Sequence, residues 1–449
     1  MSHQKTYHIE IWGCQMNVAD AAAAARRLES LGYIEAPDPA DADLVLLETC
    51  CVREKPEHKI YSRLGELRPF KEARPNMLIG VCGCMAQKEG RNIIKHAAVR
   101  VDLVVGPRRL YRLPELLDAL ERTGEPQIDV EMEETPEEAG EQNYDIYRRQ
   151  GTLKAFVNII EGCNYRCAYC IVPYVRGKFT SRQPAAVVDE VRRLVDAGIK
   201  EVNLLGQSVL AYGRDQARAF DIVHLFELLQ DINGLERIRF TTNHPLEVTD
   251  RMIAAVADMP KVMEHFHMPI QAGDDRLLAA MKRGYTVARY EEALATIRAR
   301  IPNVSITSDI IIGFPGETEE MFDRSVETYQ RMSFDQQFMF VYSARPGTPA
   351  ADMPDQIPQS VKVARMVRMV EIQNAISAAR NSAQAGSVFE VMVEGPSSRN
   401  PEKFTGRARN DKALVFTCPA NYHPQRGEIV QVEAEEGRLW GFSGKLVIS

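Results

Sequence analysis

Three cysteines stand in one short run of the chain, Gly162-Cys-Asn-Tyr-Arg-Cys-Ala-Tyr-Cys170, directly after an apolar stretch typical of a strand. With this spacing, Cys163, Cys167 and Cys170 can bind three irons of a four-iron cluster and leave the fourth iron open for chemistry on a ligand. A structural zinc site is one alternative, but zinc requires four ligands and the run contains no His. Three buried thiols packed as core residues are the other alternative.

Three further cysteines, Cys14, Cys50 and Cys84, each follow a different strand-like stretch in the first part of the chain. In a parallel α/β sheet, ligands gather beyond the carboxyl ends of the strands, so these side chains are expected to converge there. The pattern predicts a second site with three thiolates, and scattered buried thiols are the alternative. Cys51 and Cys82 each lie beside one of the proposed ligands, and the spacing alone does not choose between neighbours.

The elements that must position the second set of cysteines alternate between strand and helix. Asn17 is the expected N-cap of an Ala-rich helix that runs to Leu31. The other expected elements are strands at 7–12, 43–47, 77–81 and 103–105, and helices at 54–67 and 87–96. This alternation predicts a parallel, doubly wound α/β domain over residues 1–123.

The following segment repeats the strand and helix pattern at least five times. Its expected strands are 154–160, 201–205, 237–240, 262–267, 305–312 and 336–341, with helices between them such as 184–197. Six such units without closure predict a partial (βα)6 barrel, and a long helix at 359–385 would join it to the next segment. Sites in such barrels lie on the loops that follow the strands. The run from Cys163 to Cys170 occupies the first of these loops, and the domain is expected to span 151–384.

An acidic segment separates the two α/β regions. From Glu125 to Tyr147 there are nine Asp or Glu and no Lys or Arg, and without this segment the net charge of −7 would be +2. Such a run is typical of a solvated linker, which we place at 124–150. The net charge therefore does not exclude a nucleic-acid partner.

The last segment, 385–449, changes to short alternating strands at 388–393, 413–416, 429–432 and 445–448. This pattern predicts a small β-barrel, a common form for RNA binding. Its candidate phosphate contacts are the clustered basic residues Arg399, Lys403, Arg407, Arg409 and Lys412. An ordinary charged surface is the alternative, because the module carries equal numbers of basic and acidic residues. Cys418 is interpreted as a packing residue.

The composition is that of a globular protein, with 45% hydrophobic and 26% charged residues in 449. No apolar run approaches the roughly 20 residues that span a bilayer, and the N-terminus has no hydrophobic signal core. Nine cysteines bunched around motifs favour metal ligation over disulfides. We therefore expect a cytoplasmic protein without a membrane partner.

Taken together, the motifs resemble those of the radical S-adenosylmethionine (SAM) methylthiotransferases, over nearly the whole chain and in the family's order. They are Gly13–Asn17, Thr49–Glu54, Gly83–Gln87, Glu161–Gly177, Leu205–Gln207, Arg239–Pro245, His267–Gln271 and Asp309–Glu317. The last module resembles a TRAM domain. The chain departs from the family pattern at Glu48, where Asn is usual, and between Gln207 and Gly213.

The resemblance implies two [4Fe-4S] clusters, one on Cys14, Cys50 and Cys84 and one on the run of Cys163, and no catalytic residues beyond them. It also implies SAM as radical source and methyl donor. Candidate SAM contacts are Tyr169, Gly206, Gln207, Gln271, Arg283, Asp309 and Gly313. We interpret His244, His265 and His267 as packing or hydrogen-bonding residues, because the cysteines already supply both clusters.

The implied reaction is methylthiolation of carbon 2 of N6-isopentenyladenosine next to the anticodon in tRNA. This carbon carries an unactivated C–H bond, which requires cofactor chemistry. The segment Arg53–Gly65 favours this branch over the branches that modify threonylcarbamoyl-adenosine in tRNA or a ribosomal-protein aspartate. A metal-containing RNA-binding protein is the alternative that is not an enzyme.

Expected partners are the tRNA anticodon stem-loop, an electron donor such as flavodoxin or ferredoxin, and a sulfur-delivery protein. The protein is expected to be a monomer.

Overall fold

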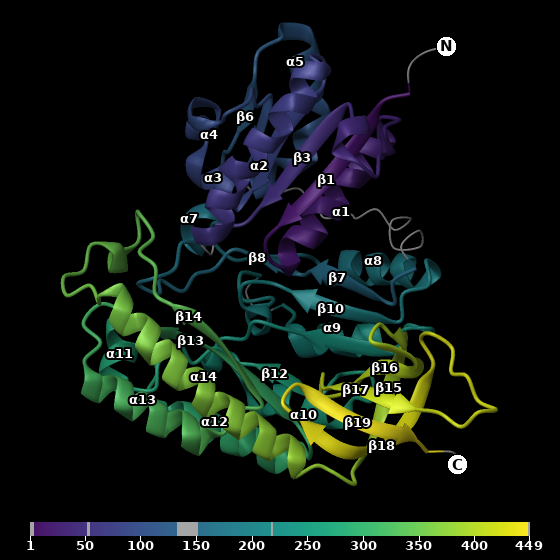
Figure 1. The fold of residues 1–449 in the computed structure, drawn as a ribbon, viewed down its shortest axis with the longest axis vertical. Coiled ribbons are helices and arrows are strands. Elements are labelled where there is room, and N and C mark those ends of the chain that lie inside the picture. Colours follow the sequence, from purple (N-terminus) through teal and green to yellow (C-terminus); the bar gives the residue numbers. More distant parts are fainter. Residues whose placement is uncertain (1–3, 52–53, 133–150, 217–218, 448–449) are drawn as a thin grey trace.

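The computed structural model describes residues 4–51, 54–132, 151–216 and 219–447, and contains three parts (Figure 1). An N-terminal α/β part lies above a central partial barrel, and a small C-terminal barrel packs beside the lower end of the centre. Among the described residues, no helix is long and apolar enough to cross a membrane. The predicted fold class is confirmed in all three parts.

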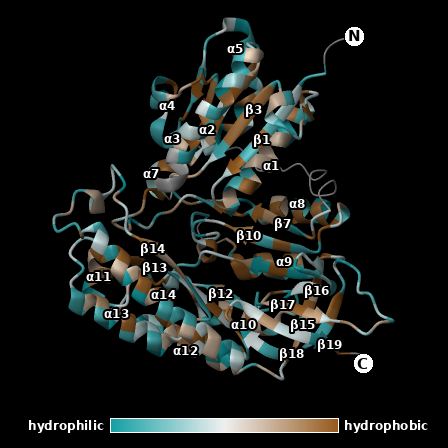
Figure 2. Ribbon diagram, in the orientation of Figure 1, coloured by the Kyte–Doolittle hydropathy of each residue, from teal (hydrophilic) through white to brown (hydrophobic). Residues whose placement is uncertain are grey.

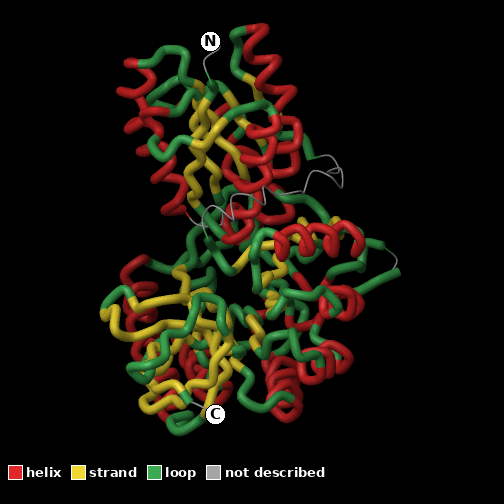
Figure 3. The backbone as a smooth tube through the Cα atoms, turned by 90° about the vertical axis from the view of Figure 1, so that its right-hand side faces the viewer, coloured by secondary structure: helices red, strands yellow, loops and turns green. Residues whose placement is uncertain are grey.

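The N-terminal part is a six-stranded, fully parallel sheet with the order β2-β1-β3-β4-β5-β6. Its strands are β1 Thr6–Trp12, β2 Ile34–Glu35, β3 Leu44–Thr49, β4 Leu78–Gly83, β5 Leu103–Val105 and β6 Gln127–Asp129. Its helices are α1 Gln15–Ser30, α2 Glu54–Ala73, α3 Cys84–Glu89, α4 Arg91–His96 and α5 Leu113–Thr123. Helices flank the sheet on both sides in the side view (Figure 3), as in a doubly wound fold.

Three details of this part differ from the expectation. Cys14, not Asn17, is the N-cap of α1, and Asn17 occupies the third helical position, where its side chain bonds back to Cys14. The single helix expected at 87–96 is divided at Gly90, whose φ of 49° interrupts it. The start of the expected linker forms β6, because its acidic residue Asp129 is buried against Arg109.

The central part contains six parallel strands that do not close into a complete barrel. They are β7 Lys154–Asn158, β10 Glu201–Leu205, β11 Arg237–Phe240, β12 His265–His267, β13 Ser305–Ile312 and β14 Gln336–Val341. Two three-stranded sheets, β11-β10-β7 and β12-β13-β14, meet at a bridge between Ile238 and Val262. The 262–267 strand is consequently shorter than expected. A small pair, β8 Ile160–Glu161 and β9 Thr180–Ser181, follows the first strand.

Helices cover the outside of these strands and bury one large hydrophobic core. They are α7 Val172–Val175, α8 Pro184–Asp196, α9 Ile222–Gln230, α10 Asp250–Asp258, α11 Asp275–Ala280, α12 Val287–Arg300, α13 Glu319–Met332 and α14 Gln359–Ser382. Figure 2 shows hydrophobic residues along the strands and hydrophilic residues on outward sides of helices such as α13. The helices therefore pack against the outer faces of the strands and do not cover the inner faces.

The C-terminal part is a closed barrel with the order β15-β16-β17-β19-β18. Its strands are β15 Val388–Ser397, β16 Asn400–Ala408, β17 Ala413–Thr417, β18 Ile429–Arg438 and β19 Gly441–Leu446. The sequence predicted four of these strands and missed β16, because its run of polar and basic residues lacks the alternation of a half-buried strand. Cys418 packs against the barrel core, as expected.

Candidate functional site

Cys14, Cys50 and Cys84 follow β1, β3 and β4 at one edge of the sheet, as the topology predicted, and Cys14 contacts Cys50 and interacts electrostatically with Cys84. A hydrogen bond with Cys50 lowers the pKa of the Cys14 thiol to about 5. Cys84 contacts Cys51, and a hydrogen bond between these two side chains lowers the pKa of Cys84. Cys14, Cys50 and Cys84 are called the N-terminal triad below, and Cys51 lies directly beside it.

Cys82, the other alternative, does not join this group. Its side chain is fully buried in the core formed by residues such as Tyr7, Leu44 and Leu103. Burial raises the pKa of the Cys82 thiol well above its ordinary value. Strand alternation alone would place Cys82 and Cys84 on one face, because they are two residues apart. Gly83, with φ +89°, ends β4 between them, so Cys82 stays in the sheet core while Cys84 begins α3 beyond the strand end.

Glycines next to the triad allow the three strand ends to approach closely. A Cβ atom on Gly13 would lie 2.6 Å from Cβ of Cys50 and 2.2 Å from Oδ1 of Asn17. Gly83 has φ +89°, and its Cβ would lie 2.4 Å from the carbonyl oxygen of Thr49. Any side chain at either position would push a cysteine away from its neighbours.

Asn17 connects the loop of Cys14 to the end of β3. Its Oδ1 accepts from the Cys14 backbone N at 3.1 Å, and its Nδ2 donates to Oε1 of Glu48 at 3.0 Å and to the Thr49 carbonyl at 3.2 Å. Burial raises the pKa of Glu48 well above its ordinary value, which favours the neutral acid. A neutral carboxyl group offers the same acceptor oxygen as an amide, so Glu48 fits the position where the resemblance expects Asn.

Cys163, Cys167 and Cys170, called the loop triad below, lie on the loop after β7 and β8. The loop is held by backbone bonds from Cys163 N to the Gly177 carbonyl at 2.9 Å and from Cys170 N to the Cys167 carbonyl at 3.1 Å. Burial, together with an electrostatic interaction with the neighbouring Cys167, raises the pKa of Cys163 and of Cys170 to about 12. These thiols therefore need a strong positive partner, such as iron, to become thiolate ligands.

Arg283 is a cation in direct contact with the loop triad. Its guanidinium donates to Sγ of Cys167 at 3.2 Å, to the Pro269 carbonyl at 2.9 Å and to the Tyr285 hydroxyl at 3.0 Å. All three nitrogens are thus used within the protein. Tyr169 is near enough to interact with this guanidinium, so both residues lie at the cysteine loop as expected.

The other candidate SAM contacts fall at three places. The backbone N of Gln271, in the segment after β12, donates to the carbonyl of Asp309 within β13 at 2.9 Å. Gln207 reaches the N-terminal part, where its amide contacts Sδ of Met16, and a Cβ on Gly206 would lie 2.4 Å from Ile160. The Gly313 backbone N donates to Glu317 at 2.8 Å beneath α14. The structure therefore pairs Tyr169 with Arg283 and Gln271 with Asp309, and the Pro269 carbonyl that accepts from Arg283 lies two residues before Gln271.

A chain of hydrogen bonds crosses one inner face of the partial barrel. Thr307 Oγ1 lies 2.9 Å from Nε2 of His265 and 3.0 Å from Nδ1 of His267, and Nε2 of His267 lies 3.4 Å from Asp309. Thr307 Oγ1 therefore joins the two imidazole rings, and the ring of His267 faces the Asp309 carboxylate. Phe338, 42% exposed, stands edge-on to His267.

His244 has a packing role instead. Its ring stacks on Tyr165 of the cysteine loop, with centroids 3.9 Å apart, and lies edge-on to Tyr285. Burial lowers the pKa of His244 to about 2, so its ring is neutral. The three histidines thus have the packing and hydrogen-bonding contacts that the sequence analysis expected.

Arg176, which the sequence analysis did not select, joins the two α/β parts. It follows the loop triad and reaches the N-terminal triad, where its Nε donates to Sγ of Cys84 at 3.2 Å. It also donates to Oδ2 of Asp20 at 2.5 Å and to Oε1 of Glu161 at 3.2 Å. Arg176 is the second-to-last residue of the Glu161–Gly177 motif. Its place within that motif is the sequence signal that could have identified it as a functional residue.

The basic residues of the C-terminal barrel divide into two groups. Arg409 pairs with Glu264 at 2.7 Å, and Lys412 pairs with Asp335 at 2.8 Å, so both are turned toward the central part. Arg407 pairs within its own barrel with Asp411 at 3.4 Å and Glu394 at 3.7 Å. Arg399 is exposed in the turn before β16, and Lys403 is half-buried on β16.

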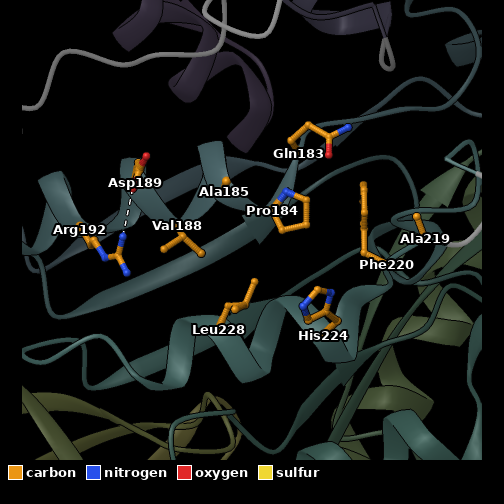
Figure 4. A pocket seen from close by; sticks show the side chains of 10 residues that line it. All are labelled: Gln183, Pro184, Ala185, Val188, Asp189, Arg192, Ala219, Phe220, His224 and Leu228. Carbon is orange, nitrogen blue, oxygen red and sulfur yellow. Dashed lines mark hydrogen bonds and ion pairs between the residues drawn. The ribbon is translucent and has the colours of Figure 1, made fainter.

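A pocket of about 490 Å³ lies between α8 and α9 (Figure 4). Its lining includes Val188, Phe220, His224 and Leu228, and its rim carries an ion pair between Asp189 and Arg192. The pocket belongs to the helix layer, whereas the cysteine triads lie beyond the strand ends. It has no part in positioning either triad.

The spacing of the donors bears on what the triads can hold. In the described part of the chain, no three His, Cys, Asp or Glu side chains are arranged to hold one metal ion. Thiolates around a four-iron cluster bind different irons and therefore need not meet at a single point. The three cysteines of each triad match the number of protein ligands that leave one iron of such a cluster open.

Two family models match the chain. The model described as "Radical SAM superfamily" matches residues 157–329, which contain the loop triad. The model described as "Uncharacterized protein family UPF0004" matches residues 6–106, which contain the N-terminal triad. Each triad therefore lies in a separate family region.

Curated relatives match over the full length. The chain is 42% identical over 448 residues to a tRNA-2-methylthio-N(6)-dimethylallyladenosine synthase of Desulforamulus reducens, covering 100% of this chain and 96% of the relative. Proteins with the same name from Moorella thermoacetica and Pelotomaculum thermopropionicum are 41% and 43% identical, over 99% and 98% of both chains respectively.

Solved structures with a similar fold have low sequence identity. The radical SAM methyltransferase TsrM from Kitasatospora setae is 16% identical, with a TM-score of 0.56 over 78% of this chain and 75% of that chain. The cobalamin-dependent radical SAM enzyme OxsB is 12% identical, with a TM-score of 0.56 over 83% of this chain and 61% of that chain. These similarities cover more than three quarters of the chain and support its overall architecture.

The close approach at Gly83 can be tested by substitution. We expect Gly83→Ala to lower the free energy of unfolding of the N-terminal part by about 3 kcal/mol or more, from strain at positive φ plus the clash with Thr49. Gly316 is the matched control, because it has φ +79° but no atom within 4 Å of its Cβ position. Gly316→Ala should cost only about 1–2 kcal/mol in chemical denaturation. Equal losses would show that close packing at the triad is unimportant.

Proposed function

Because the chain belongs to the family of tRNA-2-methylthio-N(6)-dimethylallyladenosine synthases, we propose that it transfers a methylthio group to carbon 2 of N6-isopentenyladenosine in tRNA. Dimethylallyl and isopentenyl are two names for the same substituent. The observation that carries the proposal is the convergence of Cys14, Cys50 and Cys84 in a chain whose radical SAM region holds a separate triad. Membership of the family confirms the resemblance that the motifs predicted.

The loop triad has the donors that a radical SAM enzyme requires, and membership of this superfamily implies a [4Fe-4S] cluster and SAM. Cys163, Cys167 and Cys170 would hold three irons. Arg283 would hold the Cys167 sulfur through its hydrogen bond, and the Tyr165–His244 stack would fix the loop. Hydrogen bonds to ligand sulfurs are one means by which proteins tune a cluster.

The N-terminal triad has donors for a second [4Fe-4S] cluster. Cys84 receives a hydrogen bond from a guanidinium and the Cys14 thiol has a lowered pKa, both of which favour the thiolate. Cys14 is exposed, whereas Cys50 and Cys84 are buried, so one side of the site faces solvent. With both groups bound, the site would supply an electron for SAM cleavage and a sulfur for the methylthio group.

The protein's own residues would position the substrate. Among the SAM candidates, Tyr169 pairs with Arg283 at the cysteine loop and Gln271 pairs with Asp309 of the neighbouring β13, which supports a SAM position between these two pairs. The C–H bond at carbon 2 of adenine is not acidic, so no acid or base is required to break it. The chain's task is therefore to orient the base and to exclude water.

The tRNA partner follows from the same proposal. An adenosine in a single-stranded loop can be turned outward at low cost, which suits an active site set beyond strand ends. Arg399 and Lys403 are the basic residues of the C-terminal barrel best placed to meet phosphates, since Arg409 and Lys412 are paired with the central part. The proposed reaction also requires an electron donor, such as flavodoxin or ferredoxin, and a sulfur-delivery protein as partners.

The substrate can be tested in cells. We expect tRNA from a strain lacking this gene to lose 2-methylthio-N6-isopentenyladenosine and to accumulate N6-isopentenyladenosine, because the enzyme that converts one into the other is missing. Mass spectrometry of nucleosides from digested bulk tRNA measures both. Restoring the gene should return the methylthiolated nucleoside.

Unchanged levels of both nucleosides would contradict this substrate. The next nucleoside to quantify would then be threonylcarbamoyl-adenosine and its methylthio derivative in the same digest. A ribosomal-protein aspartate would be examined by mass spectrometry of ribosomes.

The second cluster can be tested by iron analysis. Anaerobically purified protein should contain roughly eight irons per chain, as expected for two four-iron clusters. The triple variant Cys14→Ala, Cys50→Ala, Cys84→Ala should retain about four, because the loop triad is unchanged. Cys82→Ala is the control at a buried cysteine outside the triad, and it should retain the full iron content. Zinc in place of iron would rule out the radical mechanism.

The two groups of basic residues should behave differently in tRNA binding. We expect Arg399→Ala with Lys403→Ala to weaken binding of an anticodon stem-loop and to reduce the slope of log Kd against log salt by about one to two units, since two phosphate contacts are lost. Lys412→Met should instead lower thermal stability, because it leaves Asp335 with fewer partners.

The matched control for charge is Lys445→Ala, since Lys445 lies on the same barrel but is paired with Glu433 and Glu435. It should leave the slope unchanged. Lys445→Ala and the Arg399, Lys403 double variant would reduce the slope equally only if any loss of positive charge on the barrel weakens binding. That result would contradict the assignment of Arg399 and Lys403 as phosphate contacts.

A further inference from the structure

Arg176 is a buried cation at the interface of the two α/β parts. Only 2% of its surface is exposed, and its three nitrogens donate to Cys84, Asp20 and Glu161. Cys84 and Asp20 belong to the N-terminal part, whereas Arg176 and Glu161 belong to the central part. The contact with a sulfur is therefore made across the interface.

Two carboxylates balance the buried charge of Arg176, so the sulfur contact is not required for neutrality. Nδ2 of Asn158 donates to the other oxygen of Asp20 at 3.3 Å, which fixes this carboxylate from the central part as well. With both ion pairs formed, the planar guanidinium has one nitrogen left, Nε, and its direction is set by the other two. That nitrogen points at Sγ of Cys84.

Glu161 links the same guanidinium to the loop triad. It lies two residues before Cys163 and is separated from it by Gly162. Arg108, from the N-terminal part, approaches the other oxygen of Glu161 at 4.0 Å and donates to the Lys178 carbonyl at 2.8 Å. The interface thus alternates acid and base through Asp20, Arg176, Glu161 and Arg108.

We propose that Arg176 is a positioning residue that fixes the N-terminal triad relative to the loop triad and raises the reduction potential of the cluster on the N-terminal triad through its hydrogen bond to Cys84. The inference rests on the proposed function, since it requires a cluster at this triad. A hydrogen bond to a ligand sulfur stabilises the more negative, reduced cluster, and reduction potentials depend on such bonds. Arg283 makes the equivalent contact with Cys167 at the same distance of 3.2 Å.

The test uses the full-length chain with Cys163→Ala, Cys167→Ala and Cys170→Ala, which leaves only the N-terminal cluster. Into this background we introduce Arg176→Lys, which keeps the positive charge but cannot donate to three acceptors in one plane. Arg108→Lys is the matched control, because Arg108 lies at the same interface, approaches the same Glu161 at 4.0 Å and has its hydrogen bonds among the described residues with Lys178 and Thr180. Iron content and a potentiometric titration followed by electron paramagnetic resonance are measured for all three proteins.

We expect Arg176→Lys to lower the ratio of reduced to oxidised cluster at a fixed potential about tenfold, which corresponds to about 59 mV for one electron. Arg108→Lys should leave the titration unchanged. Loss of iron from Arg176→Lys alone would also support the proposal, because it would show that Arg176 keeps Cys84 in place.

Two outcomes would overturn the inference. A full iron content with an unchanged titration in Arg176→Lys would show that the hydrogen bond does not act on the cluster. Equal effects of both lysine variants would show that the interface as a whole, not the contact with Cys84, is responsible. If the background protein itself binds no iron, the second cluster of the proposed function fails, which is a separate result.

Discussion

A guanidinium that is 2% exposed must have its charge balanced, and Arg176 meets this requirement where the two α/β parts join. Asp20 arrives from α1 and Glu161 from the strand before the loop triad, so the ion pairs fix the two parts against each other. The position of the N-terminal triad relative to the loop triad depends on this contact. Removing one partner would leave buried charge uncompensated, which typically costs about 3–5 kcal/mol.

Buried arginines also join the C-terminal barrel to the central part. Arg237, fully buried, donates to the Arg407 carbonyl at 2.7 Å, and Arg239 donates to the carbonyls of Ala408 and Arg409. These contacts lie at the amino ends of the central strands, opposite the cysteines. The barrel therefore has a fixed place in the molecule, and the basic residues that secure it are not available to RNA on that face.

Much of the candidate site could be predicted from the sequence, because cysteines in a parallel sheet must converge if each follows a different strand. The cysteine motif that begins at Cys163 could be recognised from the spacing of neighbouring residues alone. Choosing between Cys50 and Cys51 was harder, since both reach the site, with Cys50 touching Cys14 and Cys51 touching Cys84. The roles of Arg409 and Lys412 could not be inferred, because a basic residue has the same appearance in sequence whether it faces a phosphate or a buried Asp335.

The sequence by itself determined the three-part architecture, the alternation of strands and helices, and the cysteine motifs. Hydrophobic periodicity and the position of a residue after a strand are local properties, so they can be read from neighbouring residues. The need for glycine at positions 13 and 83 is visible only in the structure, where the strand ends meet. Tertiary structure decided which charged residues are paired, since ion pairs such as Arg176 with Asp20 join residues 156 positions apart. Such pairs form according to which surfaces are buried together, and no local pattern records that.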